Sequence, residues 1–135
     1  MIFEPKGNNV KITLASTAIL LLATASAAQA DGDATAGKTV FKKCVACHTI
    51  DPANRVGPSL GGVVGRSVAS VDGFKYSKAM QEFGKDKVWD EAALSEFLAA
   101  PRTTVKGTSM VFVGLKKPQD IEDLLAFLKD PAAAN

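Results

Sequence analysis

The sequence predicts an all-α fold of three to five helices joined by long ordered loops. No stretch of useful length alternates apolar and polar residues, as a half-buried strand would. Glycine and proline are dense between residues 51 and 72, which indicates loop rather than sheet. The clearest periodic segment repeats instead at the helical spacing i, i+3, i+4 and i+7, with Ile121, Leu124, Leu125 and Leu128.

Residues 1–30 have the features of an export signal. Lys6 and Lys11 give a basic start, an apolar stretch runs over residues 12–28, and Ala28-Gln29-Ala30 is a small-x-small cleavage site. An uncleaved membrane anchor is the alternative, but the stretch is short of the ~20 strongly apolar residues that a span needs. We expect cleavage after Ala30, a periplasmic location, no stable membrane insertion, and one domain over residues 31–135.

Three helices are predicted in the first part of that domain. Asp33 can cap a first helix that runs to Lys42. A second, short helix covers residues 77–83. A third begins after an Asp90 N-cap, with Trp89 and Leu94 at the hydrophobic-staple positions, and is stopped by Pro101.

A long loop and a final helix complete the domain. The loop is predicted over residues 102–117, and a loop of this length suggests a functional reason. The last helix opens with Pro118 in its first turn, has acidic residues near its positive end, and ends near Pro131.

The charge balance argues against a nucleic-acid partner. Without residues 1–30, which hold Glu4, Lys6 and Lys11, the chain carries 14 basic and 13 acidic residues. That balance is too even for a nucleic-acid binder, and no basic run interleaves with aromatic residues.

The segment Cys44-Val45-Ala46-Cys47-His48 is the most specific pattern in the chain. A single C-x-x-C-H motif behind an export signal predicts covalent attachment of one haem c, with the histidine as an iron ligand. A structural zinc site would need four ligands, and the chain has only these two cysteines and one histidine. A thioredoxin-like dithiol would need a βαβ context, and a disulfide over so short a loop would add little stability.

A second axial ligand must come from a residue other than histidine, because His48 is the only one. Once Met1 leaves with the signal, the thioether candidates are Met80 and Met110. Met80 falls in the short helix, where methionine commonly fills the core. Met110 follows a glycine in the long loop, where the backbone can present its sulfur, so position favours Met110 and leaves Met80 open.

Several further motifs occur in the order found in class I c-type cytochromes: Cys44–His48, Gly57-Pro58-Ser59-Leu60, Gly65-Arg66, Gly73–Ser77, Trp89 and Gly107-Thr108-Ser109-Met110. Over residues 33–128 the chain resembles this family, and within it bacterial cytochrome c2 and mitochondrial cytochrome c. The resemblance implies His48 and Met110 as axial ligands and Cys44 and Cys47 as thioether anchors.

The resemblance also implies roles around the haem. The Pro58 carbonyl would accept the other ring N–H of His48. Arg66, Tyr76 and Trp89 would meet the haem propionates. Gly37 and Phe41 of the first helix would pack on Leu124 and Phe127 of the last.

The chain departs from the family pattern at three positions near the predicted site. Phe97 stands where a tyrosine is common, Lys106 where a proline is common, and Met80 where an asparagine is common. A small insertion lies between Gln81 and Lys87.

Two protein ligands on iron leave no open position for a substrate, which favours outer-sphere electron transfer over catalysis. We therefore expect a soluble electron shuttle that is not an enzyme. The alternative is a haem-based peroxidase or gas sensor in which Met110 dissociates.

The distribution of cations suggests how partners are chosen. In a class I fold six cations would ring the exposed haem edge: Lys42, Lys43, Arg102, Lys106, Lys116 and Lys117. Such a ring would steer a monomeric carrier toward acidic docking patches. The partners we expect are a bc1-type complex or a dehydrogenase as donor, and an oxidase or photosynthetic reaction centre as acceptor.

Overall fold

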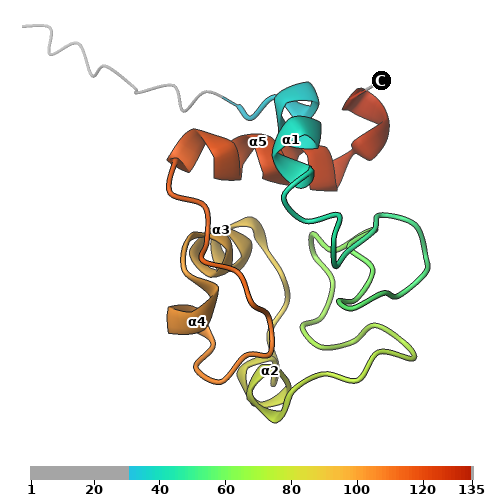
Figure 1. The fold of residues 1–135 in the computed structure, drawn as a ribbon, viewed down its shortest axis with the longest axis vertical. Coiled ribbons are helices and arrows are strands. Elements are labelled where there is room, and N and C mark those ends of the chain that lie inside the picture. Colours follow the sequence, from blue (N-terminus) through green and yellow to red (C-terminus); the bar gives the residue numbers. More distant parts are fainter. Residues whose placement is uncertain (1–30, 135) are drawn as a thin grey trace, which may run out of the picture.

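Five α-helices and one 3₁₀ turn make up the regular structure of residues 31–134 (Figure 1). The structure, a computed structural model, describes residues 31–134. The elements are α1 (Ala34–Phe41), α2 (Lys78–Phe83), α3 (Glu91–Ala99), α4 (Pro101–Thr104), α5 (Pro118–Lys129) and η1 (Pro131–Ala134). Between residues 31 and 134 the only β pairing is an isolated antiparallel bridge of Ser67 with Val88, so the all-α prediction is confirmed. The predicted export signal lies outside the described residues.

The helix starts follow the predicted caps. The Asp33 carboxylate accepts hydrogen bonds from the backbone N–H groups of Thr35 and Ala36, and the Asp90 side chain accepts one from Ala93. Ser77, which was expected to lie within the second helix, is instead the N-cap of α2, and its hydroxyl accepts the N–H of Met80. These bonds satisfy N–H groups that a helix leaves without internal partners.

The prediction for Pro101 is wrong in one respect. Pro101 does end α3, whose C-cap is Ala100, but it also opens the one-turn helix α4. Proline is suited to the first position of a helix because its missing N–H is not needed there. The loop that was expected from residue 102 therefore begins at residue 105.

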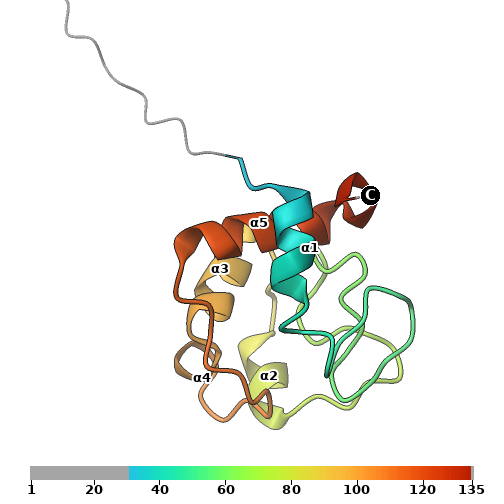
Figure 2. The ribbon, with the colours of Figure 1, turned by 45° about the horizontal axis from the view of Figure 1, so that its top comes forward.

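Helices α1 and α5 cross at one end of the molecule, and α2 lies at the opposite end (Figures 1 and 2). Gly37 is buried at the crossing, where a Cβ atom would meet the Asp123 carbonyl and come within 2.8 Å of Phe127 Cβ. The rings of Phe41 and Phe127 lie 5.2 Å apart between centroids. The predicted packing of Gly37 and Phe41 against α5 is thus confirmed.

The loops from residue 42 to 77 and from 105 to 117 lie below this crossing on two sides of the molecule (Figure 1). All four apolar residues of the predicted stripe on α5 are buried. No helix within residues 31–134 is long and apolar enough to span a membrane.

Candidate haem-binding cavity

A cavity of about 260 Å³ lies between the two long loops. Its walls are mostly apolar, with side chains from every α-helix except α4. Protein interiors are close-packed and rarely keep a void of this size. The cavity therefore calls for a large apolar group to fill it.

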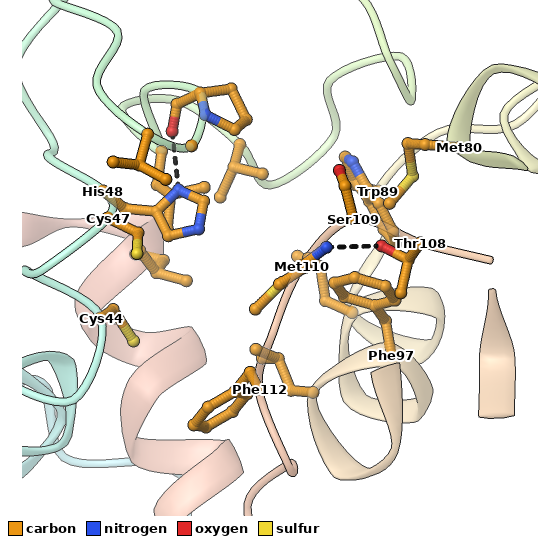
Figure 3. Close-up of a pocket in the computed structure, with 18 of the residues that line it drawn as sticks. Cys44, Cys47, His48, Met80, Trp89, Phe97, Thr108, Ser109, Met110 and Phe112 are labelled. Atoms are coloured by element: carbon orange, nitrogen blue, oxygen red, sulfur yellow. Dashed lines mark hydrogen bonds between the residues drawn. The ribbon is translucent and has the colours of Figure 1, made fainter. Parts of the chain in front are cut away.

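The C-x-x-C-H segment forms one wall of the cavity. It continues α1 as a tight turn, in which the N–H of Cys44 bonds to the Phe41 carbonyl at 2.8 Å. The N–H groups of Cys47 and His48 both bond to the Cys44 carbonyl, at 3.1 and 2.9 Å. This turn brings both sulfur atoms to the same side of the cavity as the His48 ring (Figure 3).

The orientation of His48 is fixed by the loop that follows. Its Nδ1 lies 2.8 Å from the Pro58 carbonyl oxygen. Because a carbonyl can only accept, Nδ1 carries a proton, and in the neutral ring the lone pair is on Nε2. The side chain is only 9% exposed, and Nε2 faces the cavity (Figure 3). A histidine held in this way is prepared to bind a metal through Nε2.

Gly57 packs directly on the imidazole ring. A Cβ atom at this position would contact Cε1 and come within 2.7 Å of Nδ1. The glycine is therefore needed for the ring to lie where it does. Sequence reasoning placed Gly57 in a motif but did not assign it this contact.

Met110 lies on the wall opposite the cysteines. Its thioether points into the space in front of His48 (Figure 3). Gly107 has φ of 88°, which turns the loop, and the Met110 N–H bonds to Thr108 Oγ1 at 3.2 Å. Thr108 thus positions the methionine, a contact that the sequence did not reveal.

Met80 also lines the cavity, from α2, near Trp89 (Figure 3). Both thioethers that the sequence offered are therefore at the site. Only Met110 points toward the side that holds His48 and the cysteines (Figure 3).

The remaining predicted contacts line the same cavity: Pro58, Arg66, Tyr76 and Trp89. The Arg66 guanidinium donates to the Gly61 and Ser59 carbonyls at 2.9 and 3.0 Å, and its burial lowers its pKa from the ordinary value. The Tyr76 hydroxyl accepts the Val71 N–H at 3.2 Å, which leaves its own proton free to donate to another acceptor.

Trp89 is one of the buried residues of the core. It packs between Phe83 and Phe97, with ring centroids 5.9 and 5.1 Å away. These two aromatic contacts hold the indole against the cavity.

The chemistry of the donors fits a covalently held haem. Two thiols, an imidazole nitrogen and a thioether surround one apolar cavity, and a half-buried guanidinium is among its lining groups. Burial raises the pKa of the Cys44 thiol against the opposing effect of Lys43, so this is not the low-pKa thiolate of a redox dithiol. No group of three or more metal-binding side chains occurs within residues 31–134, which gives no support to a zinc site.

The six predicted docking cations differ in their surroundings. Lys43 forms an ion pair with Asp120 at 3.3 Å. The Lys116 ammonium donates to the Val113 carbonyl at 2.8 Å. For the other four, Lys42, Arg102, Lys106 and Lys117, no ion pair is found in the described part of the chain.

Comparisons with known proteins give a consistent result. The family profile described as cytochrome c matches residues 34–131. The chain is 46% identical to cytochrome c2 of Rhodomicrobium vannielii over 121 residues, covering 88% of this chain and 93% of that protein. It is 41% identical to cytochrome c of Ulva intestinalis over 105 residues, covering 76% and 93%. Among solved structures, cytochrome cH from Methylobacterium extorquens superposes with a TM-score of 0.69 at 43% identity, covering 73% of this chain and 98% of that one.

Proposed function

The chain belongs to the cytochrome c family, and we propose that it is a periplasmic electron carrier whose haem iron is bound by His48 and Met110. Members of this family carry one covalent haem c, which supplies one-electron Fe(III)/Fe(II) chemistry when bound. The relatives include proteins named cytochrome c2, which are carriers rather than enzymes.

The observation that carries this proposal is the pairing of donors across one cavity. His48 faces the cavity from one side with its Nε2 lone pair, and the Met110 thioether faces it from the other. Iron held by both side chains would keep no open position for oxygen or peroxide. The mostly apolar walls would disfavour the extra charge of ferric iron, as a thioether ligand also would.

The other residues hold the group in place. Cys44 and Cys47 would form the thioether anchors, and the Pro58 carbonyl keeps the His48 ring oriented. We assign the haem propionates to Arg66, Tyr76 and Trp89. Two of the five guanidinium N–H groups of Arg66 donate to backbone carbonyls, which holds the guanidinium in place.

Location and partners follow from the sequence features and the relatives. We propose that residues 1–30 are an export signal and that residues 31–135 act as a monomer in the periplasm. A bc1-type complex or a dehydrogenase would donate electrons, and an oxidase or a photosynthetic reaction centre would accept them. The cations that remain unpaired within residues 31–134 favour partners with acidic surfaces.

Carbon monoxide binding tests the proposal. A ferrous iron with two firm protein ligands refuses carbon monoxide at neutral pH, and the protein gives a reversible one-electron wave in cyclic voltammetry. Rapid carbon monoxide binding would mean that Met110 dissociates, and the peroxidase or sensor function would then replace the carrier.

A further inference from the structure

The peptide group between Pro58 and Ser59 is hydrogen-bonded at both ends, and the ligand set uses only one of the two bonds. We propose that Asn54 is a positioning residue for His48, which acts through this peptide to lower the reduction potential of the bound iron. The inference rests on the proposed carrier function, and it adds a residue that sets the potential of the carrier.

Both bonds belong to one planar, delocalised amide. The oxygen of this amide, on Pro58, lies 2.8 Å from His48 Nδ1. The N–H of the same amide, on Ser59, donates to Asn54 Oδ1 at 3.0 Å. An acceptor on the N–H increases the negative charge on the oxygen, because hydrogen bonds in a chain polarise one another. The Pro58 carbonyl is therefore a stronger acceptor for His48 than it would be without Asn54.

A second hydrogen bond fixes the direction in which the Asn54 amide points. Its Nδ2 donates at 2.9 Å to the carbonyl of Asp72, 18 residues further along the chain. The Asp72 carbonyl can only accept and the Ser59 N–H can only donate, so Oδ1 must face Ser59. Both ends of the Asn54 amide are therefore in use, and its acceptor is held against the peptide that supports His48.

A purely structural role for Asn54 at this point would be largely redundant. The Ser59 hydroxyl donates to the Asp51 carbonyl and accepts the Gly61 N–H at 3.3 Å. The Ser59 carbonyl accepts from the Arg66 guanidinium at 3.0 Å, and Ser59 is only 5% exposed. These three bonds hold the segment without Asn54. Loss of the Asn54 bond should therefore change the polarisation of the peptide more than its position.

The effect reaches the iron through the imidazole ring. A stronger acceptor at Pro58 draws the Nδ1 proton of His48 and raises the basicity of Nε2, the atom that faces the cavity (Figure 3). A more basic ligand favours the ferric state, because that state carries the extra positive charge. Asn54 thus opposes the thioether and the apolar walls, which favour the ferrous state.

Three variant holoproteins are compared with wild type to test this inference. Asn54→Leu removes the acceptor from the Ser59 N–H, whereas Asn54→Asp keeps an acceptor and gives it a charge. Ser59→Ala is the matched control, because it removes the hydroxyl bonds of the same segment and leaves the bond from the peptide N–H to Asn54 intact. The measurements are the midpoint potential, the Nδ1–H proton resonance of His48 in the reduced protein, and the stability to denaturant.

Asn54→Leu should raise the ratio of reduced to oxidised protein at a fixed potential about threefold. This is a rise of about 28 mV in the midpoint potential, at 59 mV per tenfold for one electron. The Nδ1–H resonance of His48 should move upfield, because its hydrogen bond weakens. Asn54→Asp should shift both quantities in the opposite direction, since a charged acceptor is stronger. Ser59→Ala should lower stability and leave the potential and the resonance at their wild-type values.

Two outcomes overturn the inference: wild-type values of the potential and the resonance in Asn54→Leu, or equal shifts in Ser59→Ala. If Asn54→Leu does not fold, Asn54→Asp decides, and an unchanged or higher potential in that variant overturns the inference. The voltammetric wave of the wild type is recorded first. If no reversible one-electron wave is found, the carrier function itself fails, whereas a normal wave without an Asn54 effect removes only this inference.

Discussion

His48 is the residue on which the chemistry of the site depends, because the chain has no other histidine. Two neighbours set its state. The Pro58 carbonyl fixes the proton on Nδ1, and Gly57 leaves room for the ring beside the loop. The Gly57-Pro58 pair therefore acts as one positioning device, in which one residue provides the acceptor and the other provides the space.

Gly57→Ala should disturb the ligand rather than only the fold. The added Cβ would contact the imidazole, so the ring must move and its bond to Pro58 must weaken. We expect a loss of about 1–3 kcal/mol in the free energy of unfolding and altered hyperfine-shifted proton resonances of His48 in the oxidised protein.

Gly61→Ala is the control for this change. Its Cβ would meet the Ile50 carbonyl in the same loop, away from the imidazole ring. It should lower stability and leave the His48 resonances in place. If both variants shift these resonances equally, Gly57 has no particular role at the ligand.

The site residues could be predicted from sequence to different depths. The spacing of Cys44, Cys47 and His48 was sufficient by itself to predict a covalent haem site, because covalent attachment restricts both residue type and order. The choice between Met80 and Met110 was not fixed by the residues, and both do reach the cavity. The contacts of Gly57 and Thr108 escaped prediction because they depend on how two distant loops meet.

At the scale of elements, the crossing of α1 and α5 determines the shape of the domain. It brings the start of the described chain onto its last long helix, where the buried Asp123 carboxylate accepts the N–H of Asp33 at 2.8 Å. The Gln119 side chain also donates to Asp123, at 2.9 Å. The buried carboxylate thus ties the beginning of α1 to α5.

Gly37→Ala distinguishes local propensity from packing at this crossing. Alanine is favoured over glycine within a helix by about 1 kcal/mol, so propensity alone predicts a more stable protein. The Cβ would instead collide with the Asp123 carbonyl and approach Phe127. We expect a net loss of at least about 2 kcal/mol, measured by thermal or denaturant unfolding of the holoprotein.

Thr39→Ala serves as the matched variant on the exposed side of the same helix. It should keep or slightly raise the stability. A Gly37→Ala protein as stable as Thr39→Ala would show that the helices can separate without cost.

Helix prediction succeeded where the local capping signals agreed. It failed at Pro101, which both ends one helix and begins the next. Asp33 and Asp90 cap helices as expected, because a side-chain acceptor before an apolar pattern has few other interpretations. Pro101 was interpreted only as a stop, although proline can also begin a helix. Whether the chain turned into a new helix there depended on tertiary packing, since Pro101 is almost fully buried.

At the scale of the whole molecule, the central cavity leaves apolar side chains of the core without a packing partner. Covering such apolar surface is the main source of stability in a small domain, whose core is limited. The bound group is therefore part of the core and not an addition to a finished fold.

A chain that cannot attach haem should accordingly lose most of its structure. In a Cys44→Ala/Cys47→Ala variant purified without haem, we expect a weak helical signal in far-ultraviolet circular dichroism and no cooperative thermal transition. A single Cys44→Ala variant that keeps one thioether bond is the control and should remain folded. A cooperative transition in the haem-free variant would contradict this role of the cavity.

The fold class was predictable from the absence of strand patterns and from the stripe on α5, both of which are local properties. The cavity was not visible in the sequence. Its lining residues come from nearly the whole length of the domain, and each one alone is typical of an ordinary core. The ion pairing of the predicted docking cations could not be predicted from the sequence either. Lys43 pairs with Asp120 of α5, which is far from the haem-motif segment in the sequence.

The central claim is that His48 and Met110 together bind one haem iron. The most direct measurement is the optical spectrum of the oxidised holoprotein, in which sulfur bound to ferric iron gives a weak long-wavelength band. The account predicts that the band is present in wild type and in Met80→Ala and is lost in Met110→Ala. A wild-type protein without the band, or a band that disappears with Met80→Ala instead, would contradict it.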